Sequence, residues 1–214
     1  MIVYGSSLSP YVRKVLAFAV EKGIEVESRP IGIGNQDPEF REASPFGKIP
    51  GFRDGDFAIS DSTAIVTYLE ALQPEPALIP SEPRARARTI WFDEFSDTIM
   101  MACGSKMFFN RVVAPRFLGR EGDLAVADKA EREELPPILD YLERVIPDSG
   151  FLVEDRLTLA DLAIASPFAN FRHMGMECMS GRPKLAAYVE AILSRPSFAP
   201  WIARETTFLE RAAA

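Results

Sequence analysis

Residues 2–31 read IVYGSSLSPYVRKVLAFAVEKGIEVESRPI and predict a strand, a helix and a second strand. The apolar run at the start leads into a serine-rich turn. Beyond that turn, apolar residues recur with the spacing of one buried helix face, at Val12, Val15, Leu16 and Ala19. Ser9 is placed to be the N-cap of this helix, with Pro10 at its first position and Gly23 at its end.

The segments that follow complete an α/β pattern. Residues 24–31 alternate partly between apolar and polar, which indicates a strand parallel to the first. Residues 32–48 are rich in Gly, Pro, Asn and Asp and predict a loop with at most a short helix. Asp54-Gly55 separates two short apolar runs, as in a hairpin. Ser60 or Asp61 then caps another helix.

The order of these elements, βαβ followed by ββα, predicts a thioredoxin-like α/β domain over residues 1–78. Four prolines within residues 74–83 suit a linker and not a helix. Residues 84–214 read as helical throughout, so we expect an all-α C-terminal domain. The residues that share helix faces there are Trp91, Phe95 and Ile99; Leu135, Ile138, Leu139 and Leu142; and Leu185, Tyr188, Val189 and Ile192.

Composition excludes several classes of partner. The net charge is −7, and neither half of the chain is basic, which disfavours a nucleic-acid surface. The N-terminus lacks the pattern of a signal peptide, and no stretch approaches the roughly 20 apolar residues of a membrane span. Cys103 and Cys178 make neither a disulfide framework nor a metal cluster, and the single His173 adds no ligand set. We therefore expect a cytoplasmic protein without metal or membrane contact.

Three motifs carry a resemblance to a known family. They are Ser-Pro-Tyr-Val-Arg-Lys-Val at 9–15; Ser-Pro-Phe-Gly-Lys-Ile-Pro at 44–50, followed by Asp-Ser-Thr-Ala-Ile at 61–65; and Leu-Thr-Leu-Ala-Asp at 157–161. In this order and spacing the chain resembles the cytosolic glutathione transferase superfamily over essentially its whole length. The first motif is similar to the serine-type classes such as tau and theta. The last motif has the form of a helix-capping box and carries no catalytic role.

The resemblance makes Ser9 the candidate catalytic residue. A thioltransferase holds glutathione as a thiolate, although a free thiol of this kind has a pKa near ~8.5. A hydroxyl donor at a helix N-terminus favours the anion through a hydrogen bond and through the helix dipole. Ser6 and Ser7 are alternative candidates for the residue that contacts the thiol, because the zeta class places its serine a few positions earlier. Tyr4 is a further candidate, because other classes use a tyrosine at the end of the first strand. Ser9 is otherwise an ordinary N-cap.

The same resemblance assigns residues to glutathione. Ile49-Pro50 resembles the family's cis-proline turn, although only about 5–6% of X–Pro bonds are cis, and a cis bond would let the Ile49 backbone pair with the cysteinyl part of glutathione. Asp61 and Ser62 open a helix whose N–H groups accept a carboxylate, here the γ-glutamyl one. Lys48 meets the glycyl carboxylate, unless it is simply a solvated lysine. At the two motif positions where the family more often has Glu and Asn, this chain has Asp61 and Ser44, respectively.

The second substrate is expected between the two domains. Met101, Met107 and Phe108 are candidate lining residues for a small hydrophobic electrophile, together with Met100 and Phe109. Methionine and aromatic residues at helical spacing are otherwise core. The resemblance also implies a homodimer. Arg84, Arg86 and Arg88, on the helix predicted after the linker, contribute to its interface if they do not simply form a solvated face.

The resulting functional hypothesis is a glutathione transferase of the detoxification type, with glutathione as co-substrate. Peroxide reduction, isomerisation, dehalogenation and ether cleavage are possible with the same site. Thiol–disulfide exchange is disfavoured because Ser9-Pro10-Tyr11 lacks a cysteine. The alternative from another class is a non-catalytic binding or assembly module with the same fold.

Overall fold

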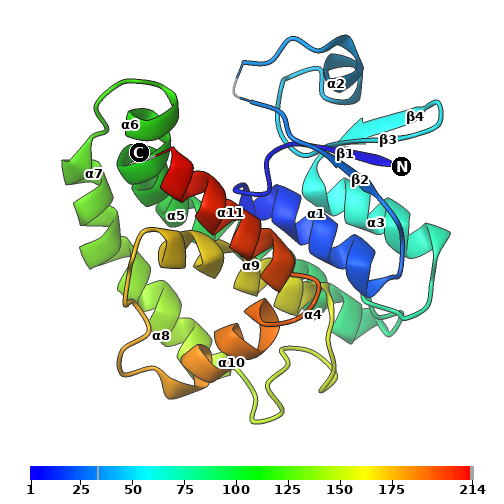
Figure 1. The fold of residues 1–214 in the computed structure, drawn as a ribbon. Coiled ribbons are helices and arrows are strands. Elements are labelled where there is room, and N and C mark those ends of the chain that lie inside the picture. Colours follow the sequence, from blue (N-terminus) through cyan, green and yellow to red (C-terminus); the bar gives the residue numbers. More distant parts are fainter. Residues whose placement is uncertain (33, 213–214) are drawn as a thin grey trace.

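The computed structural model describes residues 1–32 and 34–212, and its N-terminal part is built on a four-stranded mixed sheet (Figure 1). The strand order is β2-β1-β3-β4, with β1 parallel to β2 and the remaining neighbours antiparallel. The register places Val3 of β1 opposite Ser28 and Phe52. The bounds are Ile2–Tyr4 for β1, Glu27–Arg29 for β2, Gly51–Asp54 for β3 and Phe57–Ser60 for β4.

Strand β2 is shorter than the predicted strand over residues 24–31. At its start, the N–H of Ile24 bonds to the carbonyl of Ala19 at 2.8 Å and so belongs to the end of the preceding helix. At its end, Pro30 has no N–H to continue the ladder. The parallel pairing with β1 is as predicted.

The two faces of the sheet are covered by different helices (Figure 1). Helices α1 (Pro10–Glu21) and α3 (Ser62–Leu72) pack on one face, and the predicted apolar stripe of α1 is fully buried there. The short helix α2 (Pro38–Ala43) lies on the other face, where it forms a small apolar cluster with Tyr4 and Ile31. A side chain of the sheet therefore points either toward α1 and α3 or toward α2.

Beyond residue 82 the described chain is mainly helical, as the sequence predicts, with non-helical connections at 118–123, 146–158, 174–182 and 194–198. Two π-helical segments connect α4, α5 and α6 into one continuous helical segment, and a third connects α7 to α8. The bounds are Pro83–Glu94 for α4, Phe95–Met100 for η1, Met101–Phe108 for α5, Phe109–Val113 for η2, Ala114–Phe117 for α6, Leu124–Lys129 for α7, Ala130–Glu134 for η3, Leu135–Val145 for α8, Leu159–His173 for α9, Pro183–Leu193 for α10 and Ala199–Arg211 for α11.

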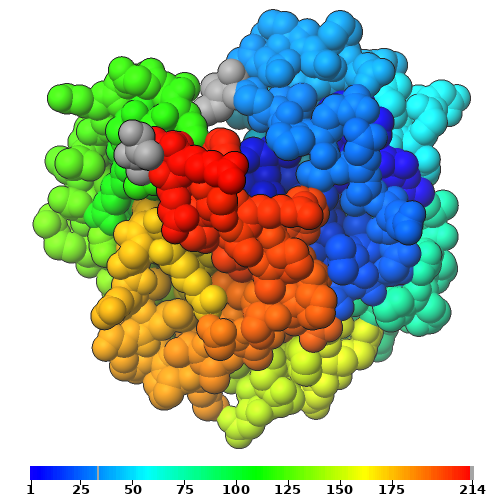
Figure 2. Space-filling model, in the orientation of Figure 1, coloured from blue at the N-terminus to red at the C-terminus, as the bar shows by residue number. Residues whose placement is uncertain are grey.

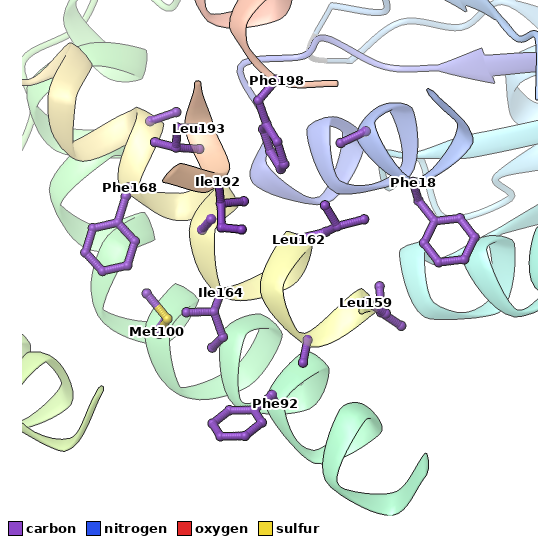
Figure 3. Close-up of a cluster of buried hydrophobic side chains, with 14 of the residues drawn as sticks. Phe18, Phe92, Met100, Leu159, Leu162, Ile164, Phe168, Ile192, Leu193 and Phe198 are labelled. Atoms are coloured by element: carbon purple, nitrogen blue, oxygen red, sulfur yellow. The ribbon is translucent and has the colours of Figure 1, made fainter. Parts of the chain in front are cut away.

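Helix α9 is the centre of the molecule, and it packs against both α1 and α4. Its side chains Leu162, Ile164 and Phe168 lie among residues of α1, α4 and α10 (Figure 3). Since burying one such side chain contributes about 1.5–3 kcal/mol, this helix joins the sheet part to the helical part through a continuous core. At its N-terminus, Asp161 accepts a hydrogen bond from the N–H of Thr158 at 2.8 Å, which is the predicted capping box.

Of the residues on the predicted face of Trp91, Phe95 and Ile99, only Phe95 is buried. Trp91 and Ile99 are 46% and 47% exposed. The buried face of α4 instead includes Phe92 and Asp93, because Asp93 forms an ion pair with α1. Among the described residues, no helix has the length and apolarity that crossing a membrane requires.

Candidate active site

Ser9 lies in the turn between β1 and α1, as the residue directly before the helix. Its backbone is extended (φ −76°, ψ 125°), and its carbonyl accepts the first helical hydrogen bond from the N–H of Arg13 at 2.9 Å. Its side chain, however, makes no capping hydrogen bond and lines a pocket. Ser9 therefore has the position of an N-cap and lines the pocket, while its side chain does not cap the helix.

Ser6 is the other serine of this turn that lines the pocket. Its hydroxyl oxygen accepts a hydrogen bond from the N–H of Leu8 at 3.4 Å. Ser7 is not among the described residues that line the pocket. The geometry thus leaves Ser9 and Ser6 as the serines that can meet a ligand.

Tyr4 points to the opposite face of the sheet. It is fully buried against Phe40, with a ring-centroid distance of 6.2 Å, and its hydroxyl donates to Glu39 at 3.2 Å. Burial raises the pKa of this phenol. Tyr4 is a core residue of the α2 side, away from the pocket.

The pocket has a volume of about 640 Å³ and is lined mostly by apolar side chains from both parts of the chain. In Figure 2 the surface is hollowed between α11 and the α/β part, with N-terminal residues at the floor of the hollow. The lining residues are Ser6, Leu8, Ser9, Pro10, Tyr11, Ile31, Gly32, Ile49, Met101, Gly104, Ser105, Phe108, Phe109, Val113, Phe117, Leu118, Pro167, Asn170, Phe171 and Phe208.

The methionine and phenylalanine residues named from the sequence divide into two groups. Met101, Phe108 and Phe109 line the pocket. Met100 and Met107 are fully buried in the main core and do not line it. The helix therefore alternates between a pocket side and a core side, which helical spacing alone does not distinguish.

The Ile49–Pro50 peptide bond is cis, as the resemblance implies, and Ile49 lines the pocket. Gly5 allows this loop to approach β1: its φ is +139°, and a Cβ there would lie 2.6 Å from Val12 and 3.0 Å from Ile49. Ser44, which replaces the usual Asn, is buried and donates to the carbonyl of Lys48 at 2.6 Å. It thereby holds the turn before the cis bond, while the Lys48 side chain is exposed.

Asp61 and Ser62 open α3, and neither lines the pocket. The carboxylate of Asp61 accepts from the N–H groups of Thr63 and Ala64, each at 3.0 Å, so it caps its own helix. Its φ of 85° is unusual for a residue with a Cβ. Ser62 is buried, and its hydroxyl donates to Asp97 at 3.1 Å.

Sequence reasoning missed a buried charged cluster beneath these residues. The ammonium group of Lys14 lies 2.6 Å from Asp93 and 2.7 Å from Asp97. The Tyr11 hydroxyl donates to the Asp97 carbonyl at 3.1 Å, and burial raises the pKa of Tyr11 to about 12. The partners of Lys14 lie about 80 positions away in the sequence, so no local pattern reveals them. The signal in the sequence is the pair of cations, Arg13 and Lys14, within the mostly apolar stretch of α1.

The fold and the pocket define a class of protein: a thioredoxin-like domain joined to a helical domain, with an apolar pocket where they meet. Residues 3–77 match the family model of the glutathione S-transferase N-terminal domain, and residues 115–205 match that of the C-terminal domain. Glutathione S-transferase 3 of Zea mays is 31% identical over 208 residues, which cover 94% of this chain and 92% of that protein.

Two further comparisons agree. Glutathione S-transferase theta-2 of Homo sapiens is 32% identical over 192 residues, which cover 85% of this chain and 77% of that protein. The structure of glutathione S-transferase III in its apo form matches with a TM-score of 0.79 at 31% identity, covering 94% of this chain and 95% of that one. The chain belongs to the glutathione S-transferase family.

Proposed function

We propose that this chain is an enzyme that reacts the thiolate of glutathione with a small hydrophobic electrophile, and that the Ser9 hydroxyl donates a hydrogen bond to the thiolate. The observation that carries the proposal is the position of Ser9. It stands at the N-terminus of α1, makes no capping bond with its side chain, and lines an apolar pocket of about 640 Å³. Family membership supports glutathione as the co-substrate.

The chemistry requires only a stabilised anion. A hydrogen bond to a charged group contributes about 1.5–3 kcal/mol, which corresponds to about one to two pKa units. A thiol of pKa ~8.5 is only about 3% ionised at pH 7; lowering its pKa by that amount raises the ionised fraction to about 25–75%. The thiol proton leaves to solvent, and the sulfur lone pair then forms the bond to the electrophilic carbon as its leaving group departs.

The remaining proposed contacts with glutathione come from other residues of the thioredoxin-like domain. The contact of Ile49 with the pocket supports pairing of the Ile49 backbone with the cysteinyl part of glutathione. The N-terminus of α3, at Asp61 and Ser62, is suited to the γ-glutamyl carboxylate. The exposed Lys48 is free of the core and suits the glycyl carboxylate.

We assign residues 1–78 to glutathione binding and residues 84–214 to the electrophile, for which Met101 and Phe108 are pocket walls. We also propose a cytoplasmic homodimer with a role in detoxification. The dimer is supported by large apolar side chains that stand exposed on the chain, above all Phe46 at 89%. Light scattering tests it: a monomeric mass overturns the dimer and leaves the site unaffected.

The experiment that tests the function combines retention on immobilised glutathione with conjugation of an aromatic halide. The comparison is wild type, Ser9→Ala and Ser149→Ala, the last being an exposed serine outside the pocket. We expect all three to be retained and Ser9→Ala to lose about 10- to 100-fold in kcat/KM, from the size of a charge-assisted hydrogen bond. Failure to bind overturns the enzyme, and binding without turnover in wild type favours the non-catalytic module.

A further inference from the structure

The peptide carbonyls on both sides of Ser9 are held by side chains of α9. The carbonyl of Leu8 accepts from the amide nitrogen of Asn170 at 2.9 Å, and the carbonyl of Pro10 accepts from the hydroxyl of Ser166 at 2.9 Å. The two donors are four residues apart on α9, so they stand one above the other on one face. The turn that presents Ser9 is therefore fixed from the helical part of the chain.

Arg13 orients both of these donors. Its Nη1 donates to the side-chain oxygen of Asn170 at 3.0 Å, and it contacts Ser166 at both the carbonyl oxygen (2.7 Å) and the hydroxyl oxygen (3.4 Å). Because the Asn170 oxygen faces this cation, its NH₂ group must face the other way, toward Leu8. Arg13 itself is fully buried, and Glu205 of α11 holds its other side.

The hydrogen bonds of Asn170 and Ser166 converge on the turn that contains Ser9. Asn170 lines the pocket together with Leu8 and Ser9, and it is itself 4% exposed. A buried ion pair is weak evidence for a role in stability, because hydrophobic residues of similar volume often do as well. What hydrophobic residues cannot do is donate hydrogen bonds to the carbonyls on each side of Ser9.

We propose that Asn170, oriented by Arg13, is a positioning residue that keeps the Ser9 hydroxyl at the thiolate position. The proposal rests on the role given to Ser9 above. Without the donor to Leu8, the turn relaxes and the Ser9 hydroxyl shifts away from the sulfur. Since a displacement of about 1 Å can cost about 100-fold in rate, the loss appears in kcat and in the pKa of bound glutathione, not chiefly in the KM for glutathione.

The test compares Asn170→Ala, Asn170→Asp, Ser9→Ala and, as a matched control, Asn110→Ala. Asn170→Asp keeps the side-chain volume and an acceptor for Arg13 but loses the donor to Leu8, so it separates positioning from packing. Asn110 is an asparagine of η2 outside the pocket lining. Circular dichroism establishes that each variant is folded, and the ultraviolet absorbance of bound glutathione reports its thiol pKa.

We expect both Asn170 variants to raise the thiol pKa of bound glutathione by at least half a unit and to lower kcat about 10-fold or more. The KM for glutathione should stay within about threefold of the wild-type value. Asn110→Ala should leave all three quantities unchanged. Folded Asn170 variants with the wild-type pKa and kcat overturn the positioning role, even if Ser9→Ala raises the pKa. If Ser9→Ala itself leaves the pKa unchanged, the proposed role of Ser9 fails and the positioning role fails with it.

Discussion

Arg13 of α1 and Glu205 of α11 form a buried, two-point ion pair that joins the first helix of the chain to the last. The guanidinium Nε lies 3.0 Å from one carboxylate oxygen and Nη2 lies 2.8 Å from the other, and the side chains are 0% and 2% exposed. The same carboxylate lies 2.9 Å from the ring of His173. Docking of α11 is thereby tied to the helix whose N-terminus presents Ser9.

This ion pair predicts a pH-dependent contribution to stability. Burial by itself would raise the pKa of Glu205, but the charge of Arg13 and the hydrogen bonds from His173 and Arg13 outweigh it and hold the pKa below the ordinary 4.5. Because the folded pKa is the lower one, the contribution is complete above about pH 4.5 and is lost as the pH falls below it. Glu205→Ala should cost about 3–5 kcal/mol at pH 7.

Urea unfolding of wild type and Glu205→Ala at several pH values checks this prediction. The difference in the free energy of unfolding should be constant from pH 7 to 5 and should shrink below pH 4.5. A difference that stays the same down to pH 3 would contradict the ionised state assigned to Glu205.

Helix α11 also supplies a wall of the pocket, through Phe208. Its ring is stacked on Phe117 with a centroid distance of 5.5 Å and an interplanar angle of 10°, and both residues line the pocket. Since an aromatic substrate ring in contact with Phe208 would gain about 0.5–1.5 kcal/mol beyond its burial, Phe208→Ala should raise the KM for an aromatic electrophile by about 3- to 10-fold. The KM for glutathione should stay unchanged.

Steady-state kinetics with each substrate varied in turn measures this effect, with Phe57→Ala, outside the pocket lining, as the control. Equal effects of Phe208→Ala on both KM values would mean that the stacked pair shapes the whole site and not the electrophile side.

Cys103 is predicted to be chemically inert in the folded protein. It is buried, its thiol faces the carbonyl of Ala130 at 3.5 Å, and burial raises its pKa to about 11. Because the thiolate is the reactive form, iodoacetamide at pH 7.5 should leave Cys103 unmodified, whereas in urea it should react fully. Mass spectrometry of the native protein measures the modification. A mixed disulfide between native Cys103 and glutathione would contradict this prediction.

The capping box of α9 is predicted to be a strong contributor to stability. Asp161 accepts from the N–H groups of Leu152 and Thr158 at 2.9 and 2.8 Å, and all of these groups are buried. Asp161→Ala removes the acceptor of these two buried N–H groups and also of the Thr158 and Tyr188 hydroxyls. At about 1–3 kcal/mol for each N–H group, we expect a loss of about 2–6 kcal/mol in the free energy of urea unfolding. Asp123→Ala, at the exposed N-cap of α7, should cost only about 1 kcal/mol; equal losses would contradict the account.

The sequence was sufficient for features that depend on neighbouring residues. The turn at Ser9-Pro10, the parallel β1–β2 pair, the hairpin at Asp54-Gly55 and the caps of α3 and α9 follow from local spacing and turn chemistry. The cis bond at Ile49–Pro50 did not follow from local chemistry, which favours trans; the family resemblance predicted it.

Features that join distant segments could not be predicted in this way. The partners of Arg13 and Lys14 lie on α4, η1, α9 and α11, and a cation within an apolar helix gives no indication of which carboxylate it will meet. For the same reason, spacing grouped Met101 with Met107, although the first lines the pocket and the second is core.

The most direct test of the central claim is the titration of the ultraviolet absorbance of glutathione bound to wild type, Ser9→Ala and Ser6→Ala. We expect a thiol pKa well below the free value of ~8.5 in wild type, a return upward by about one to two units in Ser9→Ala, and little change in Ser6→Ala. A wild-type pKa equal to that of free glutathione, or a lowered pKa that Ser9→Ala does not alter, would contradict the claim that Ser9 stabilises the thiolate.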